Sequence, residues 1–316
     1  MPAAPRTNNS YNHLFRKSRH GETVSAFLPS VRRNSNFNVW VLAKAESVVY
    51  NKVSNYMHLT EEKTMETITS RHNPLVAHLR RLASSGSYRR ERGEFLCDSP
   101  KLLHEALLHG AELLTVAATR GMALPDGIHA GVRLVEVPED VMQLISPAKT
   151  PQGVVFTCRL PRTECPQTLT GARYLALDGV QDPGNVGTIL RTLDAFEADG
   201  LVLLPGCADP FSPKTVRSSM GAVFRRPVWT CTAETFAQVL RGSGLRLLGA
   251  ALRDDTVDAR AADYTRAVLA IGSEGRGLSD EVLALCDETV RIPMSPRCES
   301  LNAAVAASVL LWEAYR

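Results

Sequence analysis

The chain has 316 residues, of which 44% are hydrophobic, 22% charged and 6% aromatic, and its formal net charge is +3. This composition is typical of a water-soluble globular protein, and the length is sufficient for two domains with cores of their own. No charge-free apolar run approaches the length of a membrane span, and the first thirty residues lack a secretory signal pattern. The seven cysteines are scattered without a C-x-x-C pair, which argues against a disulfide framework or a zinc ribbon and predicts a cytoplasmic protein without a metal site.

The positive charge is concentrated at the start of the chain. Residues 1–56 contain eight Lys and Arg against two Asp and Glu, whereas residues 57–168 contain thirteen of each sign. Residues 169–316 are slightly acidic, with fifteen basic and eighteen acidic side chains. Net charge by itself therefore does not indicate a nucleic-acid partner.

Residues 1–64 are predicted to be a disordered leader, because they are rich in Asn, Ser and Arg and show no sustained hydrophobic period. A specific RNA-binding arm is the alternative interpretation. Met57 and Met65 both precede sequence that is typical of the start of a folded domain. We therefore expect the remaining domains to fold without residues 1–56.

Residues 65–160 are predicted to form a small α/β domain, since short apolar runs alternate with segments of helical period. Helices are predicted at 75–82, 100–108 and 138–145, and strands at 95–97, 113–117, 132–137 and 153–158. A basic run at 89–92 separates the first helix from the first strand. Residues 161–172 are poor in apolar side chains and contain proline, which predicts a linker.

Residues 173–316 show a stronger alternation that predicts a parallel sheet. Short apolar runs bounded by Gly, Pro or Asp are typical of buried parallel strands, and they occur at 174–177, 201–204, 245–248, 268–271 and 290–292. A helix is predicted between the first two, at 186–196. The final helix is predicted at 301–315, and its spacing places Leu301, Val305, Val309 and Trp312 on the core side.

Three segments of this second domain are more specific than their surroundings. The first places Asp182-Pro-Gly-Asn185 directly after a strand and before a helix, with Arg191 six residues further on. Polar groups at the carboxyl end of a strand lie where open α/β sheets bind ligands. Taken alone, the segment is equally typical of a capped turn followed by a surface arginine.

The second and third segments also follow strands. Gly272, Gly275 and Gly277 are spaced as G-x-x-G-x-G, which differs from the dinucleotide-binding pattern and from the phosphate-binding P-loop. The third segment runs from Ile292 to Asn302 and ends in Ser300-Leu-Asn at the start of the last helix. Taken singly, a tight turn explains the second segment and helix capping explains the third.

Read in order, these segments resemble the SpoU (TrmH-like) class of RNA 2′-O-ribose methyltransferases. The shared pattern is D-P-G-N-V-G-x-x-x-R, then G-S-E-G-x-G-L, then I-P-M followed by S-L-N. The resemblance extends from Arg173 to the C-terminus and includes a segment around Lys214 and Arg217. The preceding domain resembles the family's small L30e-like substrate-binding domain. The sequence departs from the family pattern in two places, at Glu197 where the family usually has a glycine and at Cys97-Asp98-Ser99 in the substrate domain.

The resemblance implies a SPOUT fold, in which the C-terminal segment of a parallel sheet threads a deep trefoil knot. It also implies S-adenosylmethionine as cofactor and a homodimer that completes each site. The residues it assigns to the cofactor are Gly272, Gly275, Ile292 and Leu301. Those it assigns to the polar catalytic set are Asn185, Arg191, Glu274, Ser300 and Asn302.

The implied reaction suits these residue types. Methyl transfer from a sulfonium requires alignment and help in removing a proton from a ribose hydroxyl, with neither a metal nor a covalent enzyme intermediate. An arginine is a poor base because its pKa lies above about 12. We therefore expect Arg191 to hold the adjacent phosphate bidentately and to place the 2′-hydroxyl. Asn185 and Glu274 are expected to hold Arg191 and the ribose.

The expected substrate is ribosomal or transfer RNA, held by basic side chains of both domains: Arg80, Arg81, Arg89, Arg90, Arg92, Lys214 and Arg217. For the first five, a solvated charged face is an equally good interpretation. A non-catalytic RNA-binding or ribosome-assembly factor is the alternative function, and the intact polar set speaks against it. A nucleotide-dependent oxidoreductase is excluded by the glycine spacing.

Overall fold

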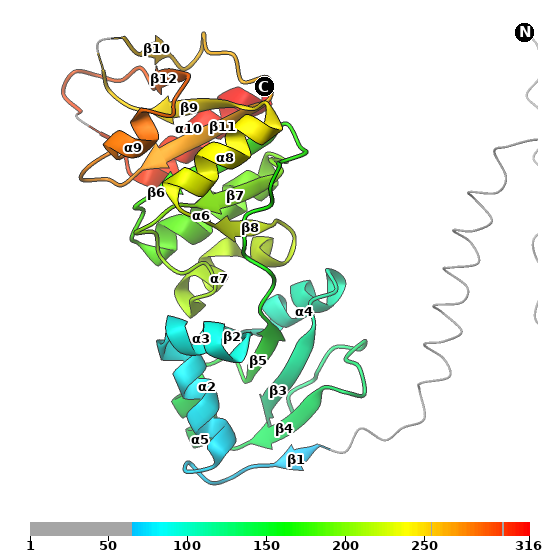
Figure 1. Cartoon of the computed structure of the whole chain (residues 1–316). Helices are drawn as coiled ribbons and strands as arrows, with labels where there is room; N and C mark the ends of the chain where they lie inside the picture. The colour runs from blue at the N-terminus through cyan, green and yellow to red at the C-terminus, as the bar shows by residue number, and fades with distance from the viewer. Residues whose placement is uncertain (1–64, 254, 299) are drawn as a thin grey trace, which may run out of the picture. The chain divides into compact units, whose positions relative to one another are not determined.

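The computed structural model describes residues 65–253, 255–298 and 300–316 (Figure 1). The predicted leader therefore lies outside the described residues. The described chain contains two sheets, one of five strands and one of seven, joined by the segment 160–172. None of its helices is both long and apolar enough to cross a membrane.

The first sheet has helices on both faces. It contains β1 (Glu66–Thr67), β2 (Glu94–Asp98), β3 (Leu113–Thr119), β4 (Arg133–Val137) and β5 (Val154–Arg159), in the order β1-β4-β3-β5-β2. One face is covered by α2 (Pro74–Ser84), α3 (Gly86–Arg92) and α5 (Glu139–Ile145), and the other by α4 (Pro100–Leu108). Alternation along β2 explains the two faces, since Leu96 packs toward the first group of helices whereas Phe95 and Cys97 pack on the side of α4.

The second sheet is parallel throughout and is covered on both faces (Figure 1). It contains β6 (Arg173–Asp178), β7 (Gly200–Leu203), β8 (Val228–Thr230), β9 (Arg246–Ala250), β10 (Val257–Asp258), β11 (Ala267–Gly272) and β12 (Glu288–Arg291), in the order β10-β12-β9-β11-β6-β7-β8. One face packs against α6 (Pro183–Ala195) and α10 (Ala303–Tyr315), with α7 (Pro213–Ser219) and η1 (Ala222–Phe224) beside α6. The other face packs against α8 (Ala233–Ser243) and α9 (Asp280–Leu283).

Each strand and helix expected from the sequence is present, and the α/β class with a parallel sheet is confirmed. Eight further elements were not expected: the strands β1, β8 and β10, which are only two or three residues long, the helices α3, α7, α8 and α9, and the short 3-10 helix η1. A trefoil knot in the C-terminal segment stays a prediction from the resemblance.

The prediction for the core side of the last helix is wrong. Ala303, Ala304, Ala307, Leu310 and Leu311 are buried in α10, whereas Val305 and Trp312 are 47% and 51% exposed. The small alanine side chains allow α10 to approach α6 and β11 closely, so the alanine face packs inward. Because the helix is apolar on nearly every side, spacing alone did not identify its buried face.

The start of α6 is set by local capping and by one close helix contact. The Asp182 carboxylate caps the helix by accepting from the Asn185 N–H at 3.0 Å, and Pro183 occupies the first helical position. Gly187 lies against α7, where a Cβ would overlap Ser218 Oγ and the carbonyl oxygen of Thr215. The glycine of the first motif is therefore required by the packing of α6 on α7.

Ion pairs and aromatic packing join the two sheets' domains. Arg217 of α7 donates to Asp98 of β2 at 2.8 Å, and Arg225 donates to Glu105 of α4. The Phe95 and Phe211 rings lie 5.0 Å apart between their centroids. Side chains from β2 and α4 thus contact the second domain on the side of α7 and η1.

Candidate active site

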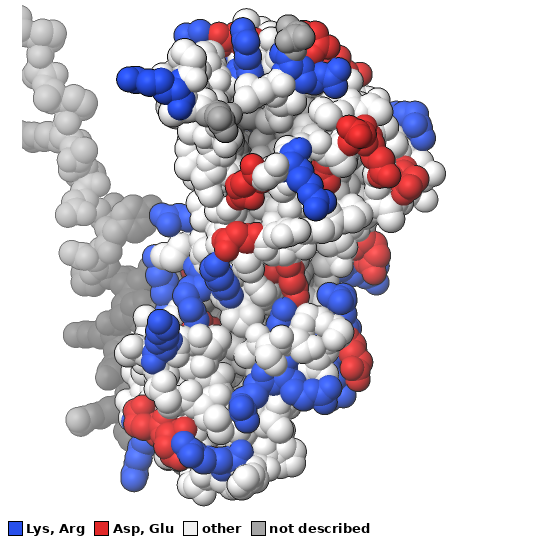
Figure 2. All heavy atoms as spheres, turned by 90° about the vertical axis from the view of Figure 1, so that its left-hand side faces the viewer, with Lys and Arg blue, Asp and Glu red and all other residues white. Residues whose placement is uncertain are grey.

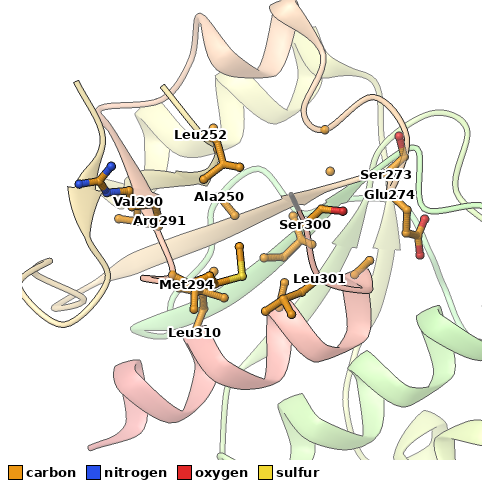
Figure 3. Close-up of a pocket in the computed structure, with 17 residues that line it drawn as sticks. Ala250, Leu252, Ser273, Glu274, Val290, Arg291, Met294, Ser300, Leu301 and Leu310 are labelled. Carbon is orange, nitrogen blue, oxygen red and sulfur yellow. The ribbon is translucent and has the colours of Figure 1, made fainter. Parts of the chain in front are cut away.

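A cavity of about 270 Å³ opens at the carboxyl ends of β9, β11 and β12 (Figure 3). Its floor is apolar, and backbone from the ends of the three strands and from the loop before α10 forms much of the rest. The lining residues that Figure 3 labels are Ala250, Leu252, Ser273, Glu274, Val290, Arg291, Met294, Ser300, Leu301 and Leu310. Glu274 and Ser273 lie at one end of this cavity and Arg291 at the other (Figure 3).

The cavity contains most of the residues that the resemblance assigned to the cofactor. Gly272, Ile292 and Leu301 line it, together with Ser300 and Glu274 of the expected catalytic set. Gly275 does not line it, and Gly277 does instead. A Cβ on Gly272 would overlap the backbone of Gly277 and Leu278, so Gly272 is required for the return of the loop upon itself.

Three of the expected polar residues form one hydrogen-bonded chain at the edge of the cavity. The Asn185 side-chain amide donates to Glu274 Oε1, and its Oδ1 accepts from the Asn302 side-chain amide at 3.1 Å. Asn302 also caps α10, since its Oδ1 accepts from the N–H groups of Ala304 and Val305 at 3.0 and 3.3 Å. Three segments distant in sequence, one from each motif, thus meet at one point.

Arg191 is not part of this chain. It lies on the exposed side of α6 and makes no side-chain hydrogen bond or ion pair within the described residues. Six residues are about one and two-thirds helical turns, which places Arg191 roughly a third of a turn away from Asn185 around the helix. Asn185 and Glu274 of this polypeptide therefore do not make the expected contact with its own Arg191.

The Asp182 carboxylate adjoins these hydrogen-bonded residues, and its surroundings stabilise its ionised form. Lys214 Nζ of α7 donates to Asp182 Oδ2 at 2.7 Å, and this hydrogen bond lowers the pKa of Asp182 below its usual value, aided by the N–H of Asn185. Both partners are exposed, with 63% of the Lys214 side chain and 48% of the Asp182 side chain accessible. Lys214 is therefore at the surface beside the Asn185 loop, although its charge is partly compensated.

The expected RNA-binding arginines divide into two groups. Arg80, Arg81, Arg90 and Arg92 are exposed on α2 and α3. Arg89 is only 4% exposed, and its guanidinium donates to Asp209 Oδ2 at 2.6 Å and to the Leu82 carbonyl oxygen at 2.5 Å. Arg89 is removed from the expected RNA surface, because its donors are used inside the protein.

Two residues that line the cavity had no signal in the sequence. Ala250 and Leu252 are ordinary apolar residues, and only their position at the end of β9 brings them to the cavity. None of the three motifs includes the end of β9, whereas Met294 belongs to the I-P-M part of the third motif. Arg291 could have been noted as a charged residue at a strand end next to Ile292.

Comparison with known proteins agrees with this geometry. The sequence pattern of the SpoU rRNA methylase family matches residues 172–312, and that of an MRM3-like substrate-binding domain matches residues 73–155. The chain is 30% identical over 248 residues to the 23S rRNA (guanosine(2553)-2′-O)-methyltransferase RlmP of Bacillus subtilis, a match that covers 78% of this chain and 98% of that protein.

Two solved structures are similar over most of the chain. The AdoMet-bound rRNA methyltransferase from Sinorhizobium meliloti superposes with a TM-score of 0.72 at 34% identity, covering 79% of this chain and 97% of that one. The SpoU methyltransferase AviRb from Streptomyces viridochromogenes, in complex with AdoMet, superposes with a TM-score of 0.69 at 29% identity, covering 78% and 98%.

The parallel sheet, the cavity at its strand ends and the attached small domain define a SPOUT-type methyltransferase that uses S-adenosylmethionine. Its reaction class is RNA 2′-O-methylation. The chain belongs to the SpoU rRNA methylase family.

Proposed function

We propose that this enzyme methylates a ribose 2′-hydroxyl in ribosomal RNA. The observation that carries the proposal is the hydrogen-bonded chain of Glu274, Asn185 and Asn302 at the edge of the cavity that Gly272 and Leu301 line. The Bacillus subtilis and Sinorhizobium meliloti relatives act on ribosomal RNA by their names, and the smaller domain matches an MRM3-like substrate-binding domain. Transfer RNA is the alternative substrate.

The cavity suits S-adenosylmethionine, because it combines an apolar floor with many strand-end backbone groups. Leu252, Met294 and Leu301 would cover a flat heterocycle, while the backbone near Gly272 and Ile292 offers hydrogen-bonding groups to its edges. S-adenosylmethionine supplies a methyl group on a positively charged sulfur, which makes that carbon electrophilic.

The side chains of the protein must then align a ribose oxygen and help it to lose a proton. Glu274 presents a carboxylate at the cavity, and the Asn185 amide holds it in place. Asn302 in turn fixes the orientation of Asn185, because it is itself locked as the cap of α10. This arrangement keeps the polar groups in one geometry before the substrate arrives, which lowers the reorganisation needed in the reaction.

Arg191 is proposed to hold the phosphate next to the reacting ribose. Its guanidinium is exposed and has no partner within the described chain, so its donors are available to a phosphate. A planar guanidinium that binds phosphate oxygens bidentately would position the 2′-hydroxyl, but a protonated guanidinium has no acceptor for the hydroxyl proton.

The enzyme is proposed to act as a homodimer through α6 and α10. A groove between these helices is lined by Asn185, Asn302 and a row of apolar or small side chains that includes Val305 and Trp312. The Trp312 indole packs beside the ring of Phe196, with the centroids 5.7 Å apart, yet half of the Trp312 residue remains accessible. A second copy seated on this groove would bury the apolar row and bring the exposed Arg191 of α6 to the subunit boundary.

The RNA is proposed to contact the exposed arginines of α2 and α3. Figure 2 shows the side of the molecule that lies at the left in Figure 1, and Lys and Arg side chains gather there on the smaller domain. Arg80, Arg81, Arg90 and Arg92 are exposed on these two helices, and Arg217 of α7 keeps 45% of its side chain accessible beside them. Such side chains would hold phosphates and set the orientation of the RNA without reading its sequence.

The test is methyl transfer from labelled S-adenosylmethionine to deproteinised ribosomal RNA and, in parallel, to bulk transfer RNA. We expect label in ribosomal RNA, in a nucleoside that resists alkaline cleavage because its 2′-oxygen is methylated. Mass spectrometry of the digested RNA then identifies the nucleoside and its position. Label confined to transfer RNA would replace the proposed substrate, and no label in either with normal cofactor binding would favour the non-catalytic RNA-binding factor.

A further inference from the structure

A second cavity lies at the carboxyl ends of β7 and β8, outside the cofactor site. Its volume is about 440 Å³. The smaller domain contributes Arg89 and Arg90 of α3, the connecting segment contributes Leu160 and Thr163, and the larger domain contributes the loop 203–211 and the residues after β8. We propose that this cavity binds one unpaired nucleotide of the substrate RNA next to the methylated one, with Arg90 on its phosphate; this inference rests on the proposed function.

The first argument is position. β6, β7 and β8 are adjacent parallel strands, so their carboxyl ends lie on one edge of the sheet. The loop of Asn185 follows β6, and the cavity follows β7 and β8. An RNA strand that enters the active site over β6 would continue along this edge to the cavity.

The second argument is that backbone hydrogen bonds join the cavity wall to the loop that leads from β6 to Asn185. The Leu204 N–H donates to the Leu177 carbonyl oxygen at 2.9 Å, and the Ala208 N–H donates to the Val180 carbonyl oxygen at 2.9 Å. These bonds join the wall to residues just ahead of Asp182. A nucleotide in the cavity would therefore contact a wall that is bonded directly to the loop before Asn185.

The third argument is charge. The carboxylate of Asp209 is occupied, since Arg89 donates to its Oδ2 at 2.6 Å and the Phe211 N–H donates to its Oδ1 at 2.9 Å. The Cys207 thiol donates to the Leu177 carbonyl oxygen at 3.2 Å, and burial raises the pKa of Cys207 to about 11, so the thiol is neutral near pH 7. The charges of Arg89 and Asp209 compensate each other, so these lining residues contribute no net charge to the interior.

Arg90 is the exposed cation on the rim of this cavity. It makes no ion pair with any of the residues that the structure describes. The interior has no net charge and offers hydroxyl, thiol and backbone groups, which suit a heterocyclic base. The Arg90 guanidinium at the rim suits the phosphate attached to that base.

The fourth argument is size. A single nucleotide needs roughly 300 Å³, at the lower end of the range for ligand cavities, whereas a base-paired helix cannot enter such a space. RNA-binding proteins commonly read bases that are unstacked from single-stranded loops. The cavity therefore fits a base turned out of the strand and not a duplex.

The experiment measures RNA affinity with two variants that act on different parts of the cavity. Thr230→Trp fills the cavity from β8, where Thr230 is exposed and its backbone N–H bond to the Thr163 carbonyl oxygen is kept. Arg90→Ala removes the rim cation without adding volume. Gln238→Trp and Arg241→Ala, at exposed positions of α8 outside the cavity, are the matched controls.

The probe is a fluorescent RNA of about twelve nucleotides, single-stranded or annealed to its complement. We expect Thr230→Trp to weaken single-strand binding about tenfold, with duplex binding and cofactor binding within about twofold of the parent. Arg90→Ala should weaken binding severalfold and reduce the slope of log affinity against log salt by about 0.7, as one lost phosphate contact requires. The control variants should bind as the parent does.

Methylation of ribosomal RNA by the parent protein is measured in parallel, so that failure of the proposed function can be distinguished from failure of the proposed nucleotide site. If the parent methylates ribosomal RNA and both cavity variants bind single strands normally, the nucleotide site is wrong. Equal weakening of duplex and single strand by Thr230→Trp would also overturn it, because the cavity would then select nothing. If the parent methylates no ribosomal RNA, the proposed function fails whatever the cavity variants bind.

Discussion

Arg191 combines a position in the first motif with an exposed, unpaired guanidinium in the described chain. Asn185, six residues earlier, is the opposite case, because both ends of its amide are hydrogen-bonded to Glu274 and Asn302. Asn185 therefore has a role without the substrate present, in fixing the site, whereas the Arg191 side chain has no partner among the described residues. A substitution at Arg191 separates these two kinds of role.

Arg191→Lys keeps the positive charge but loses the planar fork that grips a phosphate in two places. We expect cofactor affinity to stay within about twofold, while single-turnover methyl transfer falls by about 30- to 1000-fold, equivalent to about 2–4 kcal/mol of transition-state stabilisation. The measurement is transfer of labelled methyl groups to RNA beside a calorimetric titration of the cofactor. A rate within twofold of the parent would show that Arg191 is a surface charge.

The two glycines of the second motif should respond differently to the same change. A Cβ on Gly272 would overlap the backbone of Gly277, whereas a Cβ on Gly275 meets no atom within 4 Å among the described residues. We expect Gly272→Ala to abolish measurable cofactor binding by displacing the loop, and Gly275→Ala to leave it within about threefold. Calorimetry with S-adenosylmethionine tests both, and equal losses would mean that Gly275 also contacts the cofactor.

At the scale of elements, the last turn of α6 is tied to the segment after η1. The Asp194 carboxylate accepts from Arg225 Nε and Arg226 Nε, each at 2.7 Å, and Arg225 also donates to Glu105 of α4. Burial raises the pKa of Asp194, but the hydrogen bonds from Arg226 and Arg225 outweigh it, so the pKa lies below its usual value. This cluster joins α6 to the smaller domain through a single arginine.

The depressed pKa determines how stability depends on pH. The stabilisation from ionised Asp194 is complete above the unfolded-state pKa of about 4 and is lost as pH falls through the lower folded-state value. We expect Asp194→Asn to lower the free energy of unfolding by about 2 kcal/mol at pH 7, and the difference from the parent to shrink below about pH 4. Urea unfolding at both pH values is the measurement.

A matched change at an exposed pair provides the control. Asp140 pairs with Arg71 at 3.1 Å with more than half of each side chain accessible, so Asp140→Asn should cost less than about 0.5 kcal/mol at pH 7. A cost for Asp194→Asn that is no larger than this, or that does not change with pH, would contradict the role of the cluster.

At the scale of the whole molecule, the proposed dimer rests on the exposed apolar side of α10. Trp312→Glu places a charge in the proposed interface, and we expect the protein to become monomeric in light scattering and to lose most of its methyl-transfer activity. Leu108→Glu on α4 is the control, since Leu108 is also exposed, at 65%, but lies in the smaller domain. A fully active monomer of the parent protein would remove the dimer from the proposed mechanism.

The sequence was a reliable guide where a residue's role is local. The five long strands of the parallel sheet and the cap of α10 at Asn302 follow from apolar runs and capping side chains near them in sequence. The start of α6 was placed three residues too late, at 186, whereas the helix begins at Pro183. The very short strands β1 and β10 were missed because two residues carry no period, and they exist by pairing with β4 and β12.

Three motifs in sequence order were enough to indicate the family, the cofactor and most of the polar site, because each motif contains its own turn or cap. What only the tertiary structure decided was which of these residues meet: Asn185 with Glu274 and Asn302, and Arg89 with Asp209 instead of with solvent. The same holds for the buried face of α10, where packing against α6 and β11 selected the alanines over Val305 and Trp312. Contacts between segments a hundred residues apart depend on how the strands are ordered in the sheet, and local sequence does not encode that order.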